Sequence, residues 1–218
     1  MTDIKLIIFD LDGTLVDSLD DLTDAANFML RYIGRGELVR DEVRLLVGQG
    51  AKRLVERAMP GATPDEVEQG IRLFLEYNDA HIADRTHLYA GVKDTLPLLA
   101  GGRMLAVISN KYAAHCCKLL EVLGVAGHFA AVMGVDSHPQ RKPSPEPLLK
   151  LMADLGMSAA ETVMVGDSSN DIIAGKAAGV ATVGCAWGYG DPSEIADADY
   201  QASNFIELLD LPLFKKGQ

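Results

Sequence analysis

Short apolar runs separated by helical patterns form the framework of this chain. Five runs have the length and the nearly continuous hydrophobicity of strands buried on both faces: residues 4–9, 104–108, 130–135, 162–165 and 180–185. Helical patterns lie between the later runs, and this alternation is typical of a parallel α/β sheet. We therefore predict a Rossmann-like, doubly wound parallel sheet whose chemically active residues lie at the carboxyl ends of the strands.

The interval that follows the first strand breaks this alternation. From about Leu15 to Thr86 only helical patterns are present. One predicted helix carries apolar residues at steps of three and four, namely Leu19, Leu22, Ala26, Met29 and Ile33. A second begins at the capping box of residues 63–66, Thr-Pro-Asp-Glu, with proline at its first position. The pattern predicts an inserted α-helical cap of four-helix-bundle type at residues 16–86, within a core domain made of residues 1–15 and 87–218.

Charge and composition narrow the classes of partner. The chain has 20 Lys and Arg residues against 31 Asp and Glu, a formal net charge of −11, whereas a nucleic-acid-binding protein needs a basic face. An anionic small molecule is compatible with this charge, because one local site can be positive on a negative protein. No apolar stretch reaches the length of a membrane span, and the first one is too short for a signal peptide. We expect a cytoplasmic protein without nucleic-acid or membrane partners, either a monomer or a homodimer.

Polar residues follow the predicted strands at one edge of the sheet. The first strand is followed by two aspartates, the second by a serine and an asparagine, the third by a lysine in its loop, and the fourth by two more aspartates. These residues are Asp10, Asp12, Ser109, Asn110, Lys142, Asp167 and Asp171. Together they supply a carboxylate nucleophile, oxygen ligands for Mg²⁺, a cation and hydroxyl donors, which phosphoryl transfer requires.

Each of these motifs has a purely structural interpretation when it is taken alone. An Asp-x-Asp-Gly sequence is often only a turn, and this one lacks the further ligands of a calcium-binding loop. Lys142 alone would be an ordinary surface lysine, and Asp171 could complement the dipole of the helix that it begins. Weak signals at four successive strand ends favour a catalytic site over a coincidence.

Four segments resemble the four motifs of the haloacid dehalogenase superfamily, in the same order and at the strand ends that the family requires. They are FDLDGTLVDS, ISN, RKPSPEPL and GDSSNDIIAGKAAG, which begin at residues 9, 108, 141 and 166. The resemblance covers nearly the whole chain. The wider sequence is similar to the phosphoglycolate phosphatases of that superfamily, through LLVGQGAKRLVERA, YNDAHIADRTHLYAGV and AWGYG. One departure is Ala90, where these proteins usually have proline, at the second junction between the insert and the core.

The roles of the strand-end residues follow from their chemistry, and the family resemblance implies the same ones. Asp10 would be the nucleophile, because a carboxylate is ionised near pH 7 and needs no base to activate it. Asp12 would protonate the leaving oxygen and later take a proton from the attacking water. Lys142 would offset the negative charge between Asp10 and the phosphate. Ser109 and Asn110 would bind the phosphate oxygens.

A magnesium ion is the cofactor that this set of residues implies. Its ligands would be the Asp10 and Asp167 carboxylates and the backbone carbonyl of Asp12, with phosphate and water completing the shell. Asp171 would hold a metal-bound water or Lys142. The expected chemistry is therefore the magnesium-dependent hydrolysis of a phosphate ester through an aspartyl phosphate.

The insert would choose the substrate. Its glycine-containing loop presents Gly48, Gln49 and Gly50, whose backbone N–H groups would point at the leaving group. Lys52 or Arg53, at the start of the next helix, would assist in binding a small carboxylate, unless both are solvated surface charges. The resemblance implies a small phosphate monoester, 2-phosphoglycolate, as the substrate, and closure of the insert over it.

Other functions of the same fold agree less well with the sequence. A phosphosugar mutase usually has an arginine in the loop where this chain has Gly50 and Ala51. A haloacid dehalogenase needs neither a metal nor an acid at the position of Asp12, and a phosphonate hydrolase needs a Schiff-base lysine for which Lys52 is poorly placed. A binding module without activity would have lost at least one of the strand-end residues. A phosphatase of broad specificity, or one that acts on pyrophosphate, is the alternative with the same mechanism.

Overall fold

Six parallel strands form one sheet in the computed structural model, which describes residues 3–215, and their order is β5-β4-β1-β6-β7-β8. They are β1 (Leu6–Phe9), β4 (Met104–Ile108), β5 (Phe129–Met133), β6 (Thr162–Gly166), β7 (Ala181–Cys185) and β8 (Tyr200–Ala202). The predicted parallel α/β sheet is confirmed, and each of the five expected strands is found within two residues of its expected ends. The strand that the sequence missed, β8, has only three residues at the edge of the sheet.

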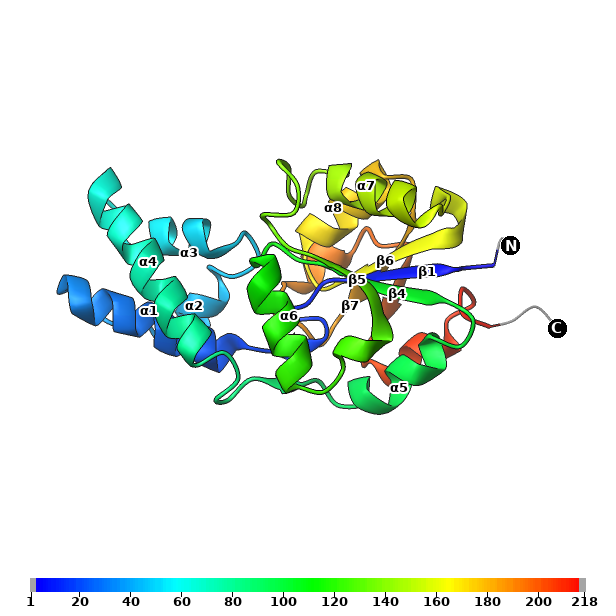
Figure 1. The fold of residues 1–218 in the computed structure, drawn as a ribbon, viewed down its shortest axis with the longest axis horizontal. Coiled ribbons are helices and arrows are strands. Elements are labelled where there is room, and N and C mark those ends of the chain that lie inside the picture. Colours follow the sequence, from blue (N-terminus) through cyan, green and yellow to red (C-terminus); the bar gives the residue numbers. More distant parts are fainter. Residues whose placement is uncertain (1–2, 216–218) are drawn as a thin grey trace.

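Helices cover both faces of this sheet. They are α5 (Val92–Leu99), α6 (Ala113–Val122), α7 (Glu146–Leu155) and α8 (Ser169–Ala177). Successive side chains of a strand point to opposite faces, so β1 contributes to two separate cores. Ile7 and Phe9 pack in the core that includes α5 and α6, whereas Leu6 and Ile8 pack in the core that includes α7 and α8. Figure 1 shows the first pair of helices below the sheet and the second pair above it.

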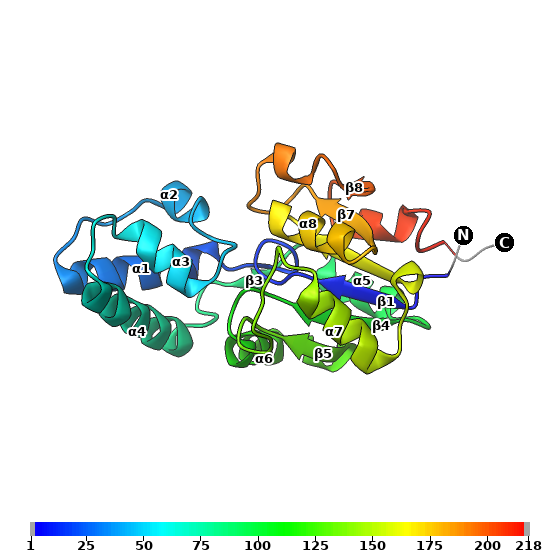
Figure 2. The ribbon, with the colours of Figure 1, turned by 90° about the horizontal axis from the view of Figure 1, so that it is seen from above.

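Four further helices stand apart from the sheet, at the end of the molecule that lies on the left in Figures 1 and 2. They are α1 (Leu19–Ile33), α2 (Arg40–Arg44), α3 (Ala51–Ala58) and α4 (Pro64–Ala80). These helices enclose an apolar core of their own, separate from the two cores of the sheet. The expected capping box begins α4: the Thr63 hydroxyl accepts from the Glu66 N–H at 3.3 Å, and the Glu66 carboxylate accepts from the Thr63 N–H at 2.7 Å.

Two short antiparallel strands join the helical part to the sheet. β2 (Val16–Asp17) leads out soon after β1, and β3 (His87–Leu88) leads back beside it. The sequence pattern indicated no strand in this region, because a pair of two-residue strands leaves no periodicity to detect. Both connections between the two parts of the molecule therefore run side by side.

Short 3₁₀ helices complete the described chain. They are η1 (Ala126–His128), η2 (Ala159–Glu161), η3 (Pro192–Ile195) and η4 (Ile206–Asp210). Within residues 3–215, no helix is both long and apolar enough to cross a membrane.

Candidate active site

The carboxyl ends of three neighbouring strands bring the expected residues together. Because β1 lies between β4 and β6, the residues that follow these strands, Asp10, Ser109 and Asp167, come to the same edge of the sheet. Asp10 continues the sheet pairing for one more residue, since its N–H donates to the Val165 carbonyl at 2.9 Å. The position of Asp10 is thereby fixed by the centre of the sheet.

Lys142 lies between two carboxylates at the centre of this edge. Its Nζ is 3.0 Å from Asp10 Oδ1 and 2.6 Å from Asp171 Oδ1, and its side chain is 1% exposed. Burial by itself lowers the pKa of the Lys142 ammonium, but the charges of Asp10 and Asp171 outweigh burial and raise that pKa above its usual value. The ammonium therefore stays charged at neutral pH, and Lys142 is not the surface lysine that its sequence alone would suggest.

Three buried aspartates meet in the same place. Asp10, Asp167 and Asp171 each offer an oxygen, and these oxygens lie within 4.8 Å of one another. Burial raises the pKa of Asp10 to about 6, although Lys142 opposes the shift. Burial, together with the charges of Asp171 and Asp10, raises the pKa of Asp167 to about 8. A cluster of oxygen donors with more negative charge than one lysine can offset fits a divalent cation such as Mg²⁺.

Asp167 is held by groups from two other parts of the chain. The Thr14 hydroxyl donates to its Oδ1 at 3.0 Å, and the Tyr189 N–H donates to its Oδ2 at 2.8 Å. Gly13, in the turn after β1, packs directly against this carboxylate: a Cβ at that position would lie 2.3 Å from Asp167 Oδ2, and its φ of +86° is also in the left-handed region. Only glycine fits this turn without moving the carboxylate.

Asp12 makes its contacts away from the acidic cluster. Its carboxylate accepts from the Ser18 hydroxyl at 2.5 Å and from Lys111 Nζ at 3.1 and 3.2 Å. Neither partner is among the site residues predicted from the sequence. Lys111 directly follows the Ser-Asn pair after β4, so its position next to a strand-end motif was a signal that could have been used.

Ser109 and Asn110 are both buried beside Asp10, but the structure gives them different contacts. Asn110 Nδ2 donates to the Gly48 carbonyl at 2.9 Å and to the Lys142 carbonyl at 3.0 Å, so both of its amide hydrogens are used within the protein. Ser109 Oγ accepts from the Lys111 N–H at 3.3 Å. The Ser109 hydroxyl hydrogen has no acceptor among residues 3–215 and can donate to a phosphate oxygen.

The loop of residues 47–51 lies against the core. Gly48 accepts hydrogen bonds from Asn110 and, at 3.4 Å, from Asn170 Nδ2. Gly50 approaches even more closely: a Cβ there would lie 2.7 Å from the Asn110 carbonyl oxygen. Gly48, Gln49 and Gly50 all line the cavities next to Asp10 and Asp12.

The structure does not bring Lys52 and Arg53 to these cavities. Lys52 is exposed and lines a groove on another side of the helical part, together with Glu56. Arg53 is also exposed and pairs with Glu56 at 2.8 Å. Helical geometry explains the difference, because Leu54 and Val55 occupy the inward face of α3 and turn the two preceding residues outward. The sequence left two interpretations of these residues open, carboxylate binding and solvated surface charges. In this structure both residues lie as solvated surface charges.

Two cavities flank Asp10 and Asp12. The smaller has a volume of about 50 Å³ and is lined by Ser109, Asn110 and Lys111 from the core, and by residues of α1, α3 and α4. The larger, about 300 Å³, is lined by Asp167 and the residues after it, and by Arg44 and Arg57. Both cavities lie where the helical part meets the carboxyl edge of the sheet.

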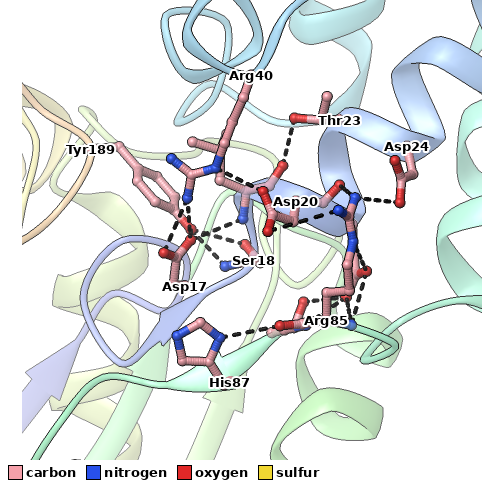
Figure 3. A network of polar contacts seen from close by, with 12 residues as sticks. Asp17, Ser18, Asp20, Thr23, Asp24, Arg40, Arg85, His87 and Tyr189 are labelled. Carbon is pink, nitrogen blue, oxygen red and sulfur yellow. Dashed lines mark hydrogen bonds and ion pairs between the residues drawn. The ribbon is translucent and has the colours of Figure 1, made fainter.

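Polar contacts tie the junction strands to the core and to the helices (Figure 3). Tyr189 Oη, from the loop after β7, accepts from the Ser18 N–H at 2.6 Å and donates to Asp17 Oδ1 at 3.0 Å. Arg40 pairs with Asp17 at 3.2 Å and with Asp20 at 2.7 Å. These contacts of Tyr189 could not be predicted from local sequence pattern, because they join segments far apart in the chain.

A second set of contacts lies on the returning junction strand. The buried Asp21 carboxylate accepts from the Thr86 N–H at 2.8 Å and from the Thr86 hydroxyl at 2.6 Å. The Arg85 guanidinium pairs with Asp24 (Figure 3). The first turn of α1 is thereby fixed to the start of β3.

Comparisons with known proteins find relatives that match nearly the whole chain. A family model described as haloacid dehalogenase-like hydrolase matches residues 7–185. The phosphoglycolate phosphatase of Chromobacterium violaceum is 41% identical over 214 residues, which cover 95% of this chain and 96% of that protein. The phosphoglycolate phosphatase of Vibrio parahaemolyticus is 38% identical over 219 residues, which cover 96% of each chain. The crystal structure of a predicted phosphoglycolate phosphatase from Haemophilus somnus superposes with a TM-score of 0.92 at 36% identity, covering 96% of this chain and 98% of that one.

Proposed function

Since this chain belongs to the haloacid dehalogenase-like hydrolase family and is a phosphatase that acts on small phosphate esters, we propose that it hydrolyses 2-phosphoglycolate to glycolate and phosphate. The reaction uses Mg²⁺ and passes through an aspartyl phosphate on Asp10. The observation that carries the proposal is the arrangement of Asp10, Asp12 and Lys142 at the carboxyl edge of the sheet, under a helical cap. Residues 16–86 form that cap, with β2 and β3 as its hinge.

Asp10 is prepared for attack by the contacts of one of its oxygens. The Leu11 N–H donates to Oδ1 at 2.7 Å, and Lys142 Nζ is 3.0 Å from the same atom. Among residues 3–215, Oδ2 has no hydrogen-bond partner, so it is the oxygen that attacks phosphorus. The Ser109 hydroxyl donates to a phosphate oxygen, and Lys142 offsets the charge that builds up between the phosphate and the carboxylate.

Asp12 transfers the proton in both chemical steps. It donates a proton to the leaving oxygen as the first bond breaks, and as a carboxylate it then takes a proton from the water that attacks the aspartyl phosphate. Ser18 and Lys111 hold the carboxylate in one orientation for both steps. The cap loop around Gly48 limits the access of bulk water during the interval between them.

The acidic cluster fits a divalent cation. Asp10, Asp167 and the Asp12 carbonyl would be the ligands of Mg²⁺, and Asp171 would hold Lys142. When bound, the cation supplies positive charge next to the phosphate oxygens. The protein's own part is to keep Asp167 in place through Thr14 and Tyr189.

Removing divalent cations is expected to abolish activity, and the affinity for Mg²⁺ is expected to rise between pH 6 and pH 8. The reason is the pKa of Asp167, which lies near 8 without metal, so that this carboxyl is mostly protonated at pH 7 and must lose its proton to bind a cation. Isothermal titration calorimetry in two buffers of different ionisation enthalpy should show close to one proton released at pH 7. An affinity that does not change over this pH range would contradict the assignment of Asp167 as a ligand.

The substrate is tested by comparing kcat/KM for 2-phosphoglycolate with the values for hexose phosphates, nucleotides and pyrophosphate. We expect 2-phosphoglycolate to be preferred by at least about tenfold, which corresponds to about 1.4 kcal/mol of transition-state discrimination. The smaller cavity is compatible with this outcome, because its space of about 50 Å³ beside Asp10 and Asp12 admits a leaving group of a few atoms. Equal values across the panel would instead indicate a phosphatase of broad specificity.

A further inference from the structure

The smaller cavity has a polar corner where the end of α4 meets the start of α6. Four polar side chains line this corner: Asn78, Lys111, Tyr112 and His115. We propose that the corner is a subsite for an anionic leaving group, in which Lys111 and Asn78 select a carboxylate. This inference rests on the proposed function and concerns the residues that determine the substrate class. Lys52 and Arg53 cannot have this role in the present structure, because they do not line the cavities beside Asp10.

The position of this cavity marks it as the place of the leaving group. The larger cavity is lined by Asp167 and by the loop after β6, where the cation and its water ligands would lie. The smaller cavity opens on the other side of Asp10 and Asp12. It lies next to Ser109, the residue whose hydroxyl would donate a hydrogen bond to the phosphate. An ester whose phosphate contacts Ser109 and whose bridging oxygen faces Asp12 therefore extends into the smaller cavity.

The walls of the smaller cavity strengthen any charge interaction inside it. Apolar side chains of the cap line one part of it, including Leu22, Val47, Leu54 and Phe74. An apolar wall excludes water and lowers the local dielectric, so a charged or polar group in the corner acts more strongly than it would at the surface. A few polar groups in such a pocket determine which ligand it accepts.

Lys111 is the cation of this corner. Its side chain is 9% exposed, and its Nζ lies 3.1 and 3.2 Å from the two oxygens of Asp12. An ammonium has three N–H donors, so at least one is left for a second anion beside Asp12. The two arginines that line a cavity at this site, Arg44 and Arg57, belong to the larger cavity instead.

Asn78 is the polar group that the cap contributes. It is 3% exposed, and its side chain has no hydrogen-bond partner in the part of the chain that the structure describes. An amide that borders a cavity can gain its hydrogen-bond partner from a ligand. The neighbouring Asp79 fixes its place, because the Asp79 carbonyl accepts from Lys118 Nζ of α6 at 2.7 Å and the Asp79 carboxylate is 3.5 Å from His115 Nε2.

The size of the cavity agrees with a two-carbon leaving group. One buried water needs roughly 10–15 Å³ of such space, so a cavity of about 50 Å³ holds roughly three to five water-sized atoms. Glycolate has five non-hydrogen atoms, of which the bridging oxygen stays beside Asp12. A carboxylate at the far end of this leaving group reaches the corner where Lys111 and Asn78 lie.

The test uses three phosphate esters that differ in the end group of a two-carbon leaving group. 2-Phosphoglycolate ends in a carboxylate, 2-hydroxyethyl phosphate in a neutral hydroxyl and phosphoethanolamine in an ammonium. The native enzyme is expected to prefer them in that order. In Asn78→Leu, kcat/KM for 2-phosphoglycolate should fall by about 10- to 100-fold, mainly through KM, and should fall much less for the neutral ester.

Asn78→Asp provides a second variant of nearly the same shape. Its added negative charge should lower kcat/KM for 2-phosphoglycolate further and raise the relative rate of phosphoethanolamine. Glu76→Leu is the matched control: it introduces a leucine on the same helix as Asn78, at an exposed side chain that lines neither cavity, and it should change the substrate ratios by less than about twofold.

The outcomes separate this inference from the proposed function. If both Asn78 variants fold and keep the native ratio of the three esters, the subsite is refuted while the assignment of 2-phosphoglycolate stands. If another ester with a carboxylate leaving group, such as 2-phospholactate, is the best substrate and the Asn78 variants lose that preference, the subsite stands while the assignment of 2-phosphoglycolate fails.

Discussion

Asp10→Asn is expected to abolish turnover of every phosphate ester, with a loss of at least about 10⁴-fold in kcat. A carboxamide has the shape of a carboxylate, but it does not attack phosphorus. Its oxygen still accepts from the Leu11 N–H and can lie beside Lys142, and Asp171 remains as the counter-charge of that lysine. The variant should therefore fold as the native protein does, which circular dichroism and thermal unfolding can verify.

The measurement for Asp10→Asn has two parts. Steady-state hydrolysis of 2-phosphoglycolate gives the loss of rate, and rapid acid quenching followed by mass spectrometry shows whether phosphate is attached to the protein. The native enzyme should carry phosphate on the peptide that contains Asp10, and the variant should carry none. Turnover at the native rate by a pure Asp10→Asn protein would show that Asp10 is not the nucleophile.

Asp12→Asn has the second largest expected effect, because one residue serves both chemical steps. The variant should lose about 10²- to 10⁴-fold in kcat on an ester with a poor leaving group, such as 2-phosphoglycolate. With p-nitrophenyl phosphate the leaving group needs no proton, so the first step should be less impaired than the second. We therefore expect a burst of p-nitrophenol followed by slow turnover, together with an accumulated aspartyl phosphate.

A matched variant separates the role of Asp12 in proton transfer from the effect of the groups that orient its carboxylate. Ser18→Ala removes one of the two groups that hold the carboxylate but leaves the carboxylate itself in place. It should lower kcat far less than Asp12→Asn and should produce no burst. An unchanged kcat of Asp12→Asn on 2-phosphoglycolate would mean that another group moves the proton.

The sheet could be predicted from the sequence because its central strands are buried on both faces. In β1, all four residues are buried, so the strand reads as a continuous apolar run that does not depend on its partners. β8 could not be found in this way, since Gln201 is exposed at the middle of its three residues. The residues at the strand ends could be placed together because parallel topology brings all carboxyl ends to one edge.

Other parts of the site depend on contacts that no local pattern contains. Asn78 lies on the cap and Lys111 on the core, and they share a cavity only because Asp79 and Lys118 bring α4 to α6. Lys52 and Arg53 illustrate the opposite error. Their distance from Gly50 along the chain is short, but the direction of α3 turns them away from the cavity.

The place of the insertion has a consequence for how this protein folds. Leu6 pairs with Met104 and with Thr162, so β1 leaves the ribosome long before either of its partners does. The buried apolar core of the cap, by contrast, is formed by one continuous segment, with α1 packed along α4. Local contacts form faster than distant ones, because they require less loop-closure entropy. During synthesis we therefore expect the cap to be structured first, and the antiparallel pairing of β2 with β3 then to bring the two ends of that segment together. The segment that we propose to close over the substrate would in this way act earlier as a folding nucleus, one that shortens the loop that β1 must close to pair with β4 and β6.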